Sequence, residues 1–234
     1  IAGTYAGWNL GLEFINMYLG HGGEFFESGS AKPAVNNSKG VATLNMMKSL
    51  TEYMNPDFLT YDSNAVQADW EAGKVALTNL WGSRAGPVTD GEGSTPEIES
   101  NTKFTSAPTV AGGSRPATTL WWDGFTVATN ISDEDAEATF KAMMNGISTQ
   151  MAVANAEKAN WLIKGAQPNP AGVGVLASAS GGALPYPMLP YFGAMHSAIG
   201  AEIVDFLQGN ETAEKALEDV EAAYIAAATE KGFL

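Results

Sequence analysis

The side chains best suited to chemistry in this 234-residue chain are tryptophans that stand beside polar groups. Trp121 and Trp122 are adjacent and precede Asp123, and Trp81 stands three residues before Arg84. A flat aromatic ring packs on the apolar C–H face of a pyranose, and planar polar groups bind its hydroxyls. The combination favours a carbohydrate site, although acids between aromatic faces would also hold a polyamine through cation–π contacts.

The two adjacent tryptophans cannot share one environment if their segment is extended. Successive side chains of an extended segment point to opposite faces, so Trp121 and Trp122 cannot both enter one core. We expect one of them to be buried and the other to face ligand, and we favour Trp122 because it adjoins Asp123. Trp70 has the helical spacing of a core residue, and a tryptophan such as Trp8 is more often packed than ligand-binding.

Local signals for catalysis are absent from the sequence. The chain has no cysteine, and its two histidines, His21 and His196, are interpreted as loop surface and helix surface. It lacks the G-x-S-x-G, S-x-x-K and H-E-x-x-H patterns. Residues 172–177 fit G-x-G-x-x-A but follow a Pro-rich stretch rather than a strand, so we interpret them as a loop. We therefore expect no catalytic residue, no metal site and no cofactor.

Composition and charge exclude several kinds of partner. The formal net charge is −14 with only 12 Lys and Arg, so a nucleic-acid backbone or an anionic membrane surface would be repelled. With 45% hydrophobic residues the chain is typical of a globular protein, as one large domain or two small ones. Ile1 is not a natural initiator, so we expect the true N-terminus to lie upstream or to have been removed.

Hydrophobic periodicity and capping signals predict a helix-rich chain with several separated strands, of the α/β or α+β class. Ser132 and Asp135 form a capping box before one of the helices. The predicted helices cover residues 10–19, 38–55, 64–72, 133–147, 148–158, 188–206 and 212–231. The predicted strands cover 75–79, 103–110 and 125–129, with a short strand and turn after residue 23 and a polar, acidic loop at 86–101.

Five stretches, in this order along nearly the whole chain, resemble family 1 extracellular solute-binding proteins, the maltose-binding-protein-like substrate receptors of bacterial ABC importers. The most specific is "ADWEAGKVALTNLWGS", a short helix, a glycine and a strand that ends in tryptophan. The others are "LGLEFINMYLGHGGEFF", "VNNSKGVATLNMMKSL", "FTSAPTVAGGSRPATTLWWDGFTVATN" and "LQGNETAEKALEDVEAAYIAAATEKGF".

The resemblance implies an α/β, periplasmic-binding-protein-like (type II) fold, in which two lobes are joined by crossing segments. Residues 1–122 would form the first part of the C-terminal lobe, 123–160 a crossing and a segment of the N-terminal lobe, and 161–234 a second crossing and the remainder of the C-terminal lobe. The first part of the N-terminal lobe would be missing. The strand at 125–129 and the helix after it would then lack sheet partners and expose apolar surface.

The resemblance also implies a set of ligand-binding residues in the interlobe cleft. It puts Trp81 and Arg84 after a strand that carries a stacking tryptophan in relatives, and it puts Trp121, Trp122 and Asp123 at the lobe crossing. Tyr191 or Phe192 begins the helix where relatives carry a stacking aromatic residue. Trp8 or Tyr5 would line the cleft from the first helix.

The function implied is that of the substrate-binding component of an ABC importer. It would capture a small ligand, expected to be a mono- or oligosaccharide, close by hinge motion and deliver the ligand to membrane permease subunits. We expect an exported, periplasmic monomer that is not an enzyme and has no nucleic-acid partner. The alternatives are a polyamine or another non-sugar solute, and a glycosidase with a carboxylate pair. Glycerol phosphate is less favoured because the few cationic residues are spread thinly.

Overall fold

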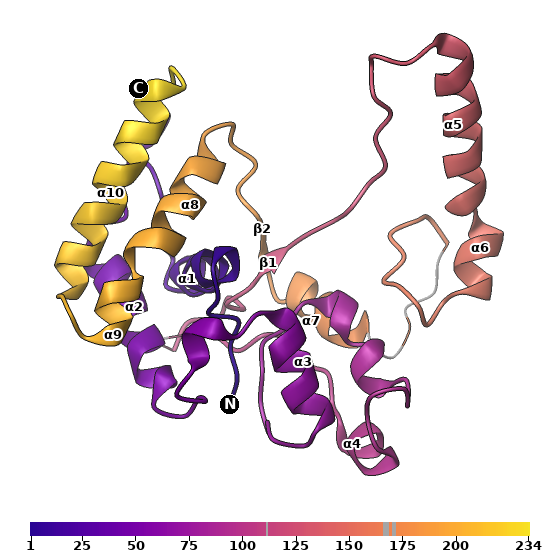
Figure 1. Ribbon diagram of the computed structural model, residues 1–234, viewed down its shortest axis with the longest axis horizontal. Coiled ribbons are helices and arrows are strands. Elements are labelled where there is room, and N and C mark those ends of the chain that lie inside the picture. Colours follow the sequence, from indigo (N-terminus) through magenta and orange to yellow (C-terminus); the bar gives the residue numbers. More distant parts are fainter. Residues whose placement is uncertain (111, 166–168, 170–171) are drawn as a thin grey trace.

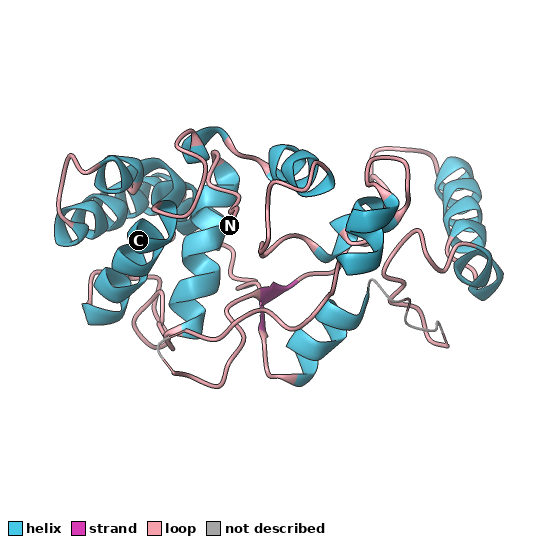
Figure 2. Ribbon diagram, turned by 90° about the horizontal axis from the view of Figure 1, so that it is seen from below, coloured by secondary structure: helices cyan, strands magenta, loops and turns pink. Residues whose placement is uncertain are grey.

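The computed structural model describes residues 1–110, 112–165, 169 and 172–234. Figure 1 shows a group of packed helices on one side and a separate projection on the other. We call α1, α2, α8, α9 and α10 the helical body, and residues 123–165 the arm. Between them lie short helices and a small central sheet, which Figure 2 shows in magenta.

The helical body holds the main hydrophobic core. Its members are α1 (Trp8–Gly20), α2 (Ser38–Thr51), α8 (Phe192–Glu202), α9 (Val204–Gln208) and α10 (Ala213–Glu230). α8 packs most extensively on α10 and α1, and α2 packs on the same two helices. The largest fully buried side chains are Tyr5, Leu10, Phe14, Ile15, Tyr18, Leu44, Met47, Phe192, Met195, Ile199, Ile203 and Tyr224.

Local capping signals explain where these helices begin and end. The Asn37 side chain accepts hydrogen bonds from the backbone N–H groups of Lys39 and Gly40, so α2 starts where the sequence predicts. Thr212 caps α10 in the same way. Gly209 has a φ of 86° and ends α9, a left-handed conformation that glycine adopts without strain. The predicted helix 188–206 is divided at Ile203 into α8 and α9.

Short helices form the region between the helical body and the arm. They are η1 (Phe58–Thr60), α3 (Ser63–Glu71), η2 (Gly82–Arg84), η3 (Pro87–Thr89), α4 (Pro96–Asn101) and α7 (Val173–Ser180). α3 confirms the predicted helix at 64–72. Two interpretations as loop are wrong: residues 86–101 contain α4, which Thr95 caps, and the glycine-rich stretch 172–177 begins α7.

Sheet structure in the described residues is smaller than the sequence predicts. β1 (Thr119–Leu120) pairs in parallel with β2 (Leu184–Pro185), with Thr119 opposite Leu184. The predicted strands at 75–79 and 103–110 make only the isolated bridges of Thr78 with Ala2 and Thr109 with Pro116. Alternation of apolar and polar residues decides which way each side chain points, but pairing also needs a neighbouring strand in register. The sequence predicts an α/β or α+β class, whereas the described residues are mostly helical and form a two-stranded sheet.

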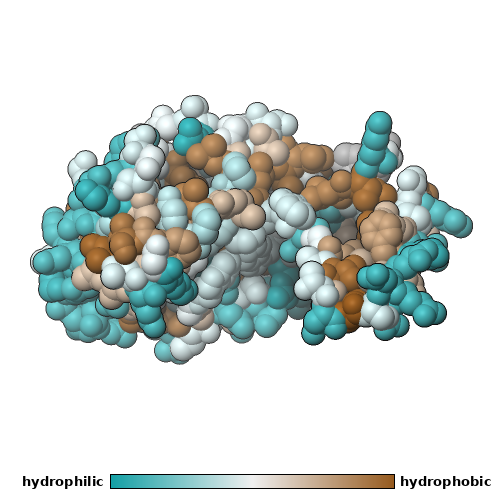
Figure 3. Space-filling model, turned by 90° about the horizontal axis from the view of Figure 1, so that it is seen from above, coloured by the Kyte–Doolittle hydropathy of each residue, from teal (hydrophilic) through white to brown (hydrophobic). Residues whose placement is uncertain are grey.

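The arm carries α5 (Asp133–Gly146) and α6 (Thr149–Ala154) away from the helical body, as Figure 1 shows. The Ser132 hydroxyl accepts from the Asp135 N–H, which confirms the predicted cap. The predicted strand at 125–129 is wrong, because this segment pairs with no strand among the described residues. Phe125 and Phe140 are 66% and 56% exposed, so the expected apolar surface is confirmed. Figure 3 shows brown, apolar surface on this side of the molecule.

Candidate functional site

Three tryptophans from separate parts of the chain meet at one place. Trp8 begins α1, Trp81 precedes η2 and Trp121 follows β1. The ring centroids of Trp8 and Trp81 are 6.3 Å apart with planes 14° from parallel, and Trp121 meets both edge to face, at 5.9 and 5.5 Å. We call these three residues the tryptophan cluster. Three of the four tryptophans predicted for the site are therefore brought together.

The tryptophan cluster is open to solvent. Trp8 is 48% exposed and Trp121 37% exposed, and Trp81 is half-buried. Large rings are usually covered in a monomeric globular protein, and an exposed group of them typically marks a surface that binds something. The tryptophan cluster is the candidate site for that reason.

The local fold brings these rings together through tight turns and close packing. Gly7, with a φ of 55°, turns the chain into α1 directly before Trp8. Gly82 follows Trp81, and a Cβ there would lie 2.3 Å from Val175, so only glycine lets this turn approach α7 so closely.

Two residues missed by sequence reasoning complete the site. The Tyr186 ring is 4.1 Å from that of Trp121, and the His196 ring stacks on Trp8 at 4.0 Å and 24°. The Tyr186 hydroxyl and His196 Nδ1 are 2.7 Å apart, and His196 Nε2 lies 2.8 Å from the Trp8 carbonyl oxygen. The interpretation of His196 as helix surface is wrong, because it is 1% exposed on the face of α8 that packs against α1. His21, by contrast, lies in the half-exposed turn after α1.

A buried polar chain orients Trp121. Its Nε1 donates to Thr119 Oγ1 at 2.8 Å, and the Thr119 hydroxyl donates to Asn16 Oδ1 at 2.9 Å. Thr119 and Asn16 are 8% and 6% exposed, so these bonds are shielded from water. The chain ties the ring of Trp121 to α1, which also carries Trp8.

Trp122 and Asp123 lie apart from the tryptophan cluster. The expectation that one of the adjacent tryptophans is buried is wrong: Trp121 is partly exposed and Trp122 is 68% exposed. The Trp122 ring lies over Gly124, where a Cβ would be 2.8 Å from it. Asp123 is exposed at the start of the arm. A ligand contact by these two residues stays a prediction.

Arg84 and Tyr191 make contacts within the protein. The Arg84 guanidinium donates to Gln67 Oε1 at 2.8 Å and to Ser63 Oγ at 3.0 Å, which ties η2 to α3. The Tyr191 hydroxyl donates to the Ser30 carbonyl at 3.2 Å, and its ring packs on Phe26. A ligand contact by Arg84 or Tyr191 stays a prediction.

The two remaining tryptophans also have structural partners. Trp70 is half-buried and its Nε1 donates to Thr102 Oγ1 at 3.1 Å, so its interpretation as a core residue holds only in part. Trp161 is half-buried at the end of the arm, and its Nε1 donates to the Asn155 carbonyl.

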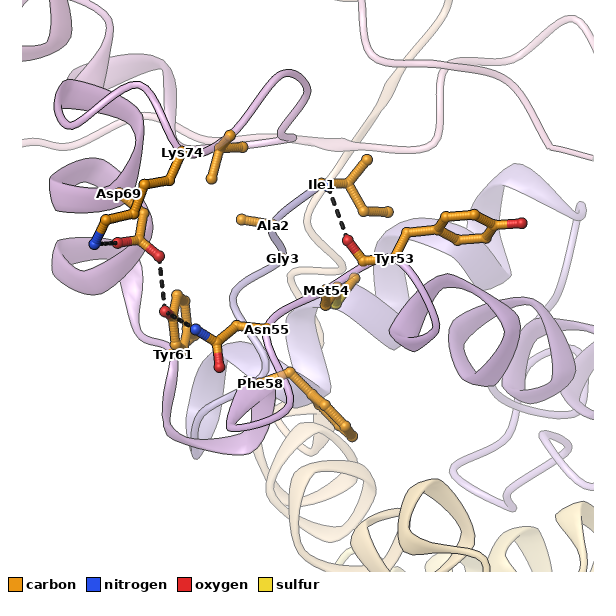
Figure 4. A pocket seen from close by; sticks show the side chains of 11 residues that line it. Ile1, Ala2, Gly3, Tyr53, Met54, Asn55, Phe58, Tyr61, Asp69 and Lys74 are labelled. Carbon is orange, nitrogen blue, oxygen red and sulfur yellow. Dashed lines mark hydrogen bonds and ion pairs between the residues drawn. The ribbon is translucent and has the colours of Figure 1, made fainter.

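A separate pocket of about 270 Å³ lies beside α3, and Figure 4 shows the side chains that line it. Asp69 accepts from the Tyr61 hydroxyl at 2.7 Å and from Lys74 at 3.0 Å, and Asn55 donates to the Tyr61 hydroxyl. The Tyr61 hydrogen bond, with help from Lys74, lowers the pKa of Asp69. Since these polar groups already pair with one another, we assign this pocket a structural role.

The described residues contain no group of three or more His, Cys, Asp or Glu side chains placed to hold a metal ion. None of the described helices has the length and apolarity that crossing a bilayer requires.

A family model described as "Bacterial extracellular solute-binding protein" matches residues 1–150. The chain belongs to this family of solute-binding proteins. Family membership confirms the resemblance of the sequence motifs. Because the family binds solutes and is non-catalytic, it also confirms that the chain is not an enzyme.

Solved structures of solute-binding proteins show the same fold. A maltose-bound MalE3 of T. maritima matches 97% of this chain with a TM-score of 0.80 and 20% identity. A ribitol complex from Agrobacterium radiobacter matches 95% with a TM-score of 0.79 and 19% identity, and a D-mannitol complex from Agrobacterium vitis matches 99% with 0.76 and 19%.

This solute-binding chain spans 61%, 57% and 62% of the lengths of those three structures, respectively. Within that share it has the periplasmic-binding-protein-like fold. A comparison with curated proteins gave no match.

Proposed function

We propose that the protein is the substrate-binding component of an ABC importer and that it captures a carbohydrate or a sugar alcohol at the tryptophan cluster. The observation that carries the proposal is the meeting of Trp8, Trp81 and Trp121, with Trp8 about half exposed. Rings of this kind hold the apolar face of a sugar by stacking, and nearby polar groups select its hydroxyls. Three of the similar structures are complexes with maltose, ribitol and D-mannitol, which supports this class of ligand.

The proposal extends to partners and location. The protein acts as an exported, periplasmic monomer that delivers its ligand to permease subunits. Residues 1–122 and 161–234 belong to one lobe, and residues 123–160 to a second lobe across the cleft. The separation of the arm from the helical body supports this division.

Ligand screening tests the class of ligand. Tryptophan fluorescence and thermal melting of the full-length protein are followed with maltose, D-mannitol, ribitol and spermidine. We expect a rise in melting temperature and a saturable fluorescence change with a sugar or sugar alcohol, because a ligand that binds only the folded state stabilises it. A response to spermidine alone would contradict the carbohydrate proposal, and turnover of aryl glycosides would contradict a binding role.

A matched pair of variants tests the site. Trp121→Ala should weaken binding roughly tenfold or more, since truncating an aromatic anchor commonly costs about 2 kcal/mol. Trp122→Ala removes an adjacent ring of the same kind that lies outside the tryptophan cluster, and it should change the affinity by less than about twofold. Isothermal titration measures both affinities. A larger loss of affinity for Trp122→Ala than for Trp121→Ala would mean that Trp122 contacts the ligand, as the sequence analysis favours.

A further inference from the structure

His196 is buried at the point where α8 packs against α1, directly behind the tryptophan cluster. The approach of the two helices is close: a Cβ on Gly11 would lie 2.6 Å from His196 Cδ2 and 2.8 Å from the His196 carbonyl oxygen. Only glycine at position 11 leaves space for this imidazole. The ring is therefore held in one place by α1.

The hydrogen bonds of His196 define its protonation. The Trp8 carbonyl oxygen can only accept, so Nε2 at 2.8 Å from it must carry the hydrogen. In the neutral ring Nδ1 is then an acceptor, and the Tyr186 hydroxyl donates to it at 2.7 Å. Both ring nitrogens of His196 are therefore hydrogen-bonded, Nε2 to the Trp8 carbonyl and Nδ1 to the Tyr186 hydroxyl.

The same imidazole contacts the rings that it orients. It stacks on the Trp8 indole at 4.0 Å and lies 5.7 Å from the Tyr186 ring. Tyr186 in turn packs against Trp121 at 4.1 Å. His196 therefore connects two members of the tryptophan cluster that are far apart in sequence, Trp8 directly and Trp121 through Tyr186.

We propose that His196 is a positioning residue of the binding site, which fixes Trp8 and Tyr186 through its two ring nitrogens while the imidazole is neutral. This role rests on the proposed function, because it concerns the shape of the surface that receives the ligand. His196 does not itself need to contact ligand.

The electrostatic surroundings agree with a neutral ring at pH 7. Burial lowers the pKa of His196, opposed in part by the Trp8 carbonyl, and burial raises the pKa of Tyr186 to about 12. The groups that contact the ring are the Trp8 carbonyl and Gly11 on α1 and the Tyr186 hydroxyl on the connector before α8. Protonation in acid puts a hydrogen on Nδ1, which then donates to the Tyr186 oxygen, so the hydrogen bond reverses its direction and a positive charge is placed in the buried site.

The first test uses ligand-free protein and does not depend on what the ligand is. A protonated imidazole stacked on an indole quenches its fluorescence, so emission should fall in a step as the pH is lowered below 6.5, the ordinary pKa of histidine, because burial lowers the pKa of His196. The step should disappear in Trp8→Phe and His196→Gln and should move to higher pH in Tyr186→Phe, where Nδ1 has lost its donor. Tyr224→Phe removes a hydroxyl that donates to the Ala31 carbonyl, away from the site, and should leave the step unchanged.

The second test measures affinity for maltose and D-mannitol. Tyr186→Phe keeps the ring and loses one hydrogen bond, so we expect binding about three- to tenfold weaker at pH 7. Below the fluorescence step the loss should persist, because the protonated Nδ1 donates to the Tyr186 oxygen that phenylalanine lacks. Tyr224→Phe is the matched control and should bind like wild type.

The outcomes separate the two proposals. If no sugar binds wild type but the fluorescence step depends on His196 and Tyr186, the carbohydrate function fails and the positioning role stands. If sugar binds while Tyr186→Phe leaves both the step and the affinity unchanged, the positioning role is overturned. Tyr186→Phe keeps this test decisive even if the buried His196→Gln variant does not fold.

Discussion

The helices α1 and α5 have nearly the same length, but they differ in composition and in surroundings: α1 is apolar and buried over most of its surface, whereas α5 begins with three acidic residues and carries a narrower apolar stripe. α1 buries Phe14 completely against the helical body, whereas α5 leaves Phe140 56% exposed in the arm. The capping of α5 by Ser132 shows that its local signals are complete. The exposed apolar stripe of α5 shows that an amphipathic pattern identifies the face of a helix that is suited to burial, and that a tertiary partner is needed to bury it.

Truncating one phenylalanine in each helix tests most strongly whether the face of α1 is buried and that of α5 is exposed. Phe14→Ala should lower the free energy of unfolding by about 3–5 kcal/mol, because it removes a fully buried ring and leaves a cavity. Phe140→Ala should change it by less than about 1 kcal/mol, since its ring is mostly in water. Urea unfolding followed by circular dichroism measures both, and equal losses would mean that the face of α5 is covered in solution.

A second comparison uses glycines inside the same two helices. Gly11→Ala should destabilise the protein by about 1–3 kcal/mol, because the new methyl group would overlap His196. Gly146→Ala, at the end of α5, has nothing within 4 Å of the added Cβ and should stabilise the arm by about 0.5–1 kcal/mol. Thermal melting distinguishes the expected fall in melting temperature for Gly11→Ala from the expected rise for Gly146→Ala. A neutral Gly11→Ala would show that α8 can move away from α1.

The parts of the fold that the sequence predicts are those whose signals lie within a few residues. Asn37, Ser132 and Thr212 each bond to a backbone N–H two or three positions ahead, so the starts of α2, α5 and α10 are readable from local pattern. Strand pairing joins distant segments, and residues 125–129 alternate correctly yet pair with nothing described. The helix α7 is not predicted, because Gly172 at its N-cap and Gly174 within it favour a loop by propensity.

The same distinction between local signals and long-range contacts applies to the residues of the candidate site. Trp8, Trp81 and Trp121 could be proposed by residue type and resemblance, but their meeting depends on three separate elements. His196 could not be found, because its bond to the Trp8 carbonyl spans 188 positions in sequence. One signal for Tyr186 was available: the aromatic ring stands between Pro185 and Pro187 before a predicted helix, in a rigid extended segment.

The smallest expected difference concerns two glutamates, one in each region. Glu13 on α1 is 5% exposed and one carboxylate oxygen accepts from both the N–H and the hydroxyl of Thr4. Burial raises the pKa of Glu13 from 4.5 in spite of these bonds. Glu137 on α5 is exposed and forms an ion pair with Lys141 at 2.7 Å, which in water is worth about 0.5 kcal/mol or less.

Glu13→Gln and Glu137→Gln each remove one charge and keep the shape of the side chain. A raised folded pKa means that the folded state holds its proton more tightly, so stability is lost as the pH rises through that pKa. Glu13→Gln should therefore raise the melting temperature at pH 7, where each 1 kcal/mol corresponds to about 2–4 °C in a chain of this size. The gain should disappear below pH 4.5, where wild-type Glu13 is neutral in both states. Glu137→Gln should be nearly flat across the same range, and a gain for Glu13→Gln that persists at pH 4 would mean that packing, not charge, limits stability at this position.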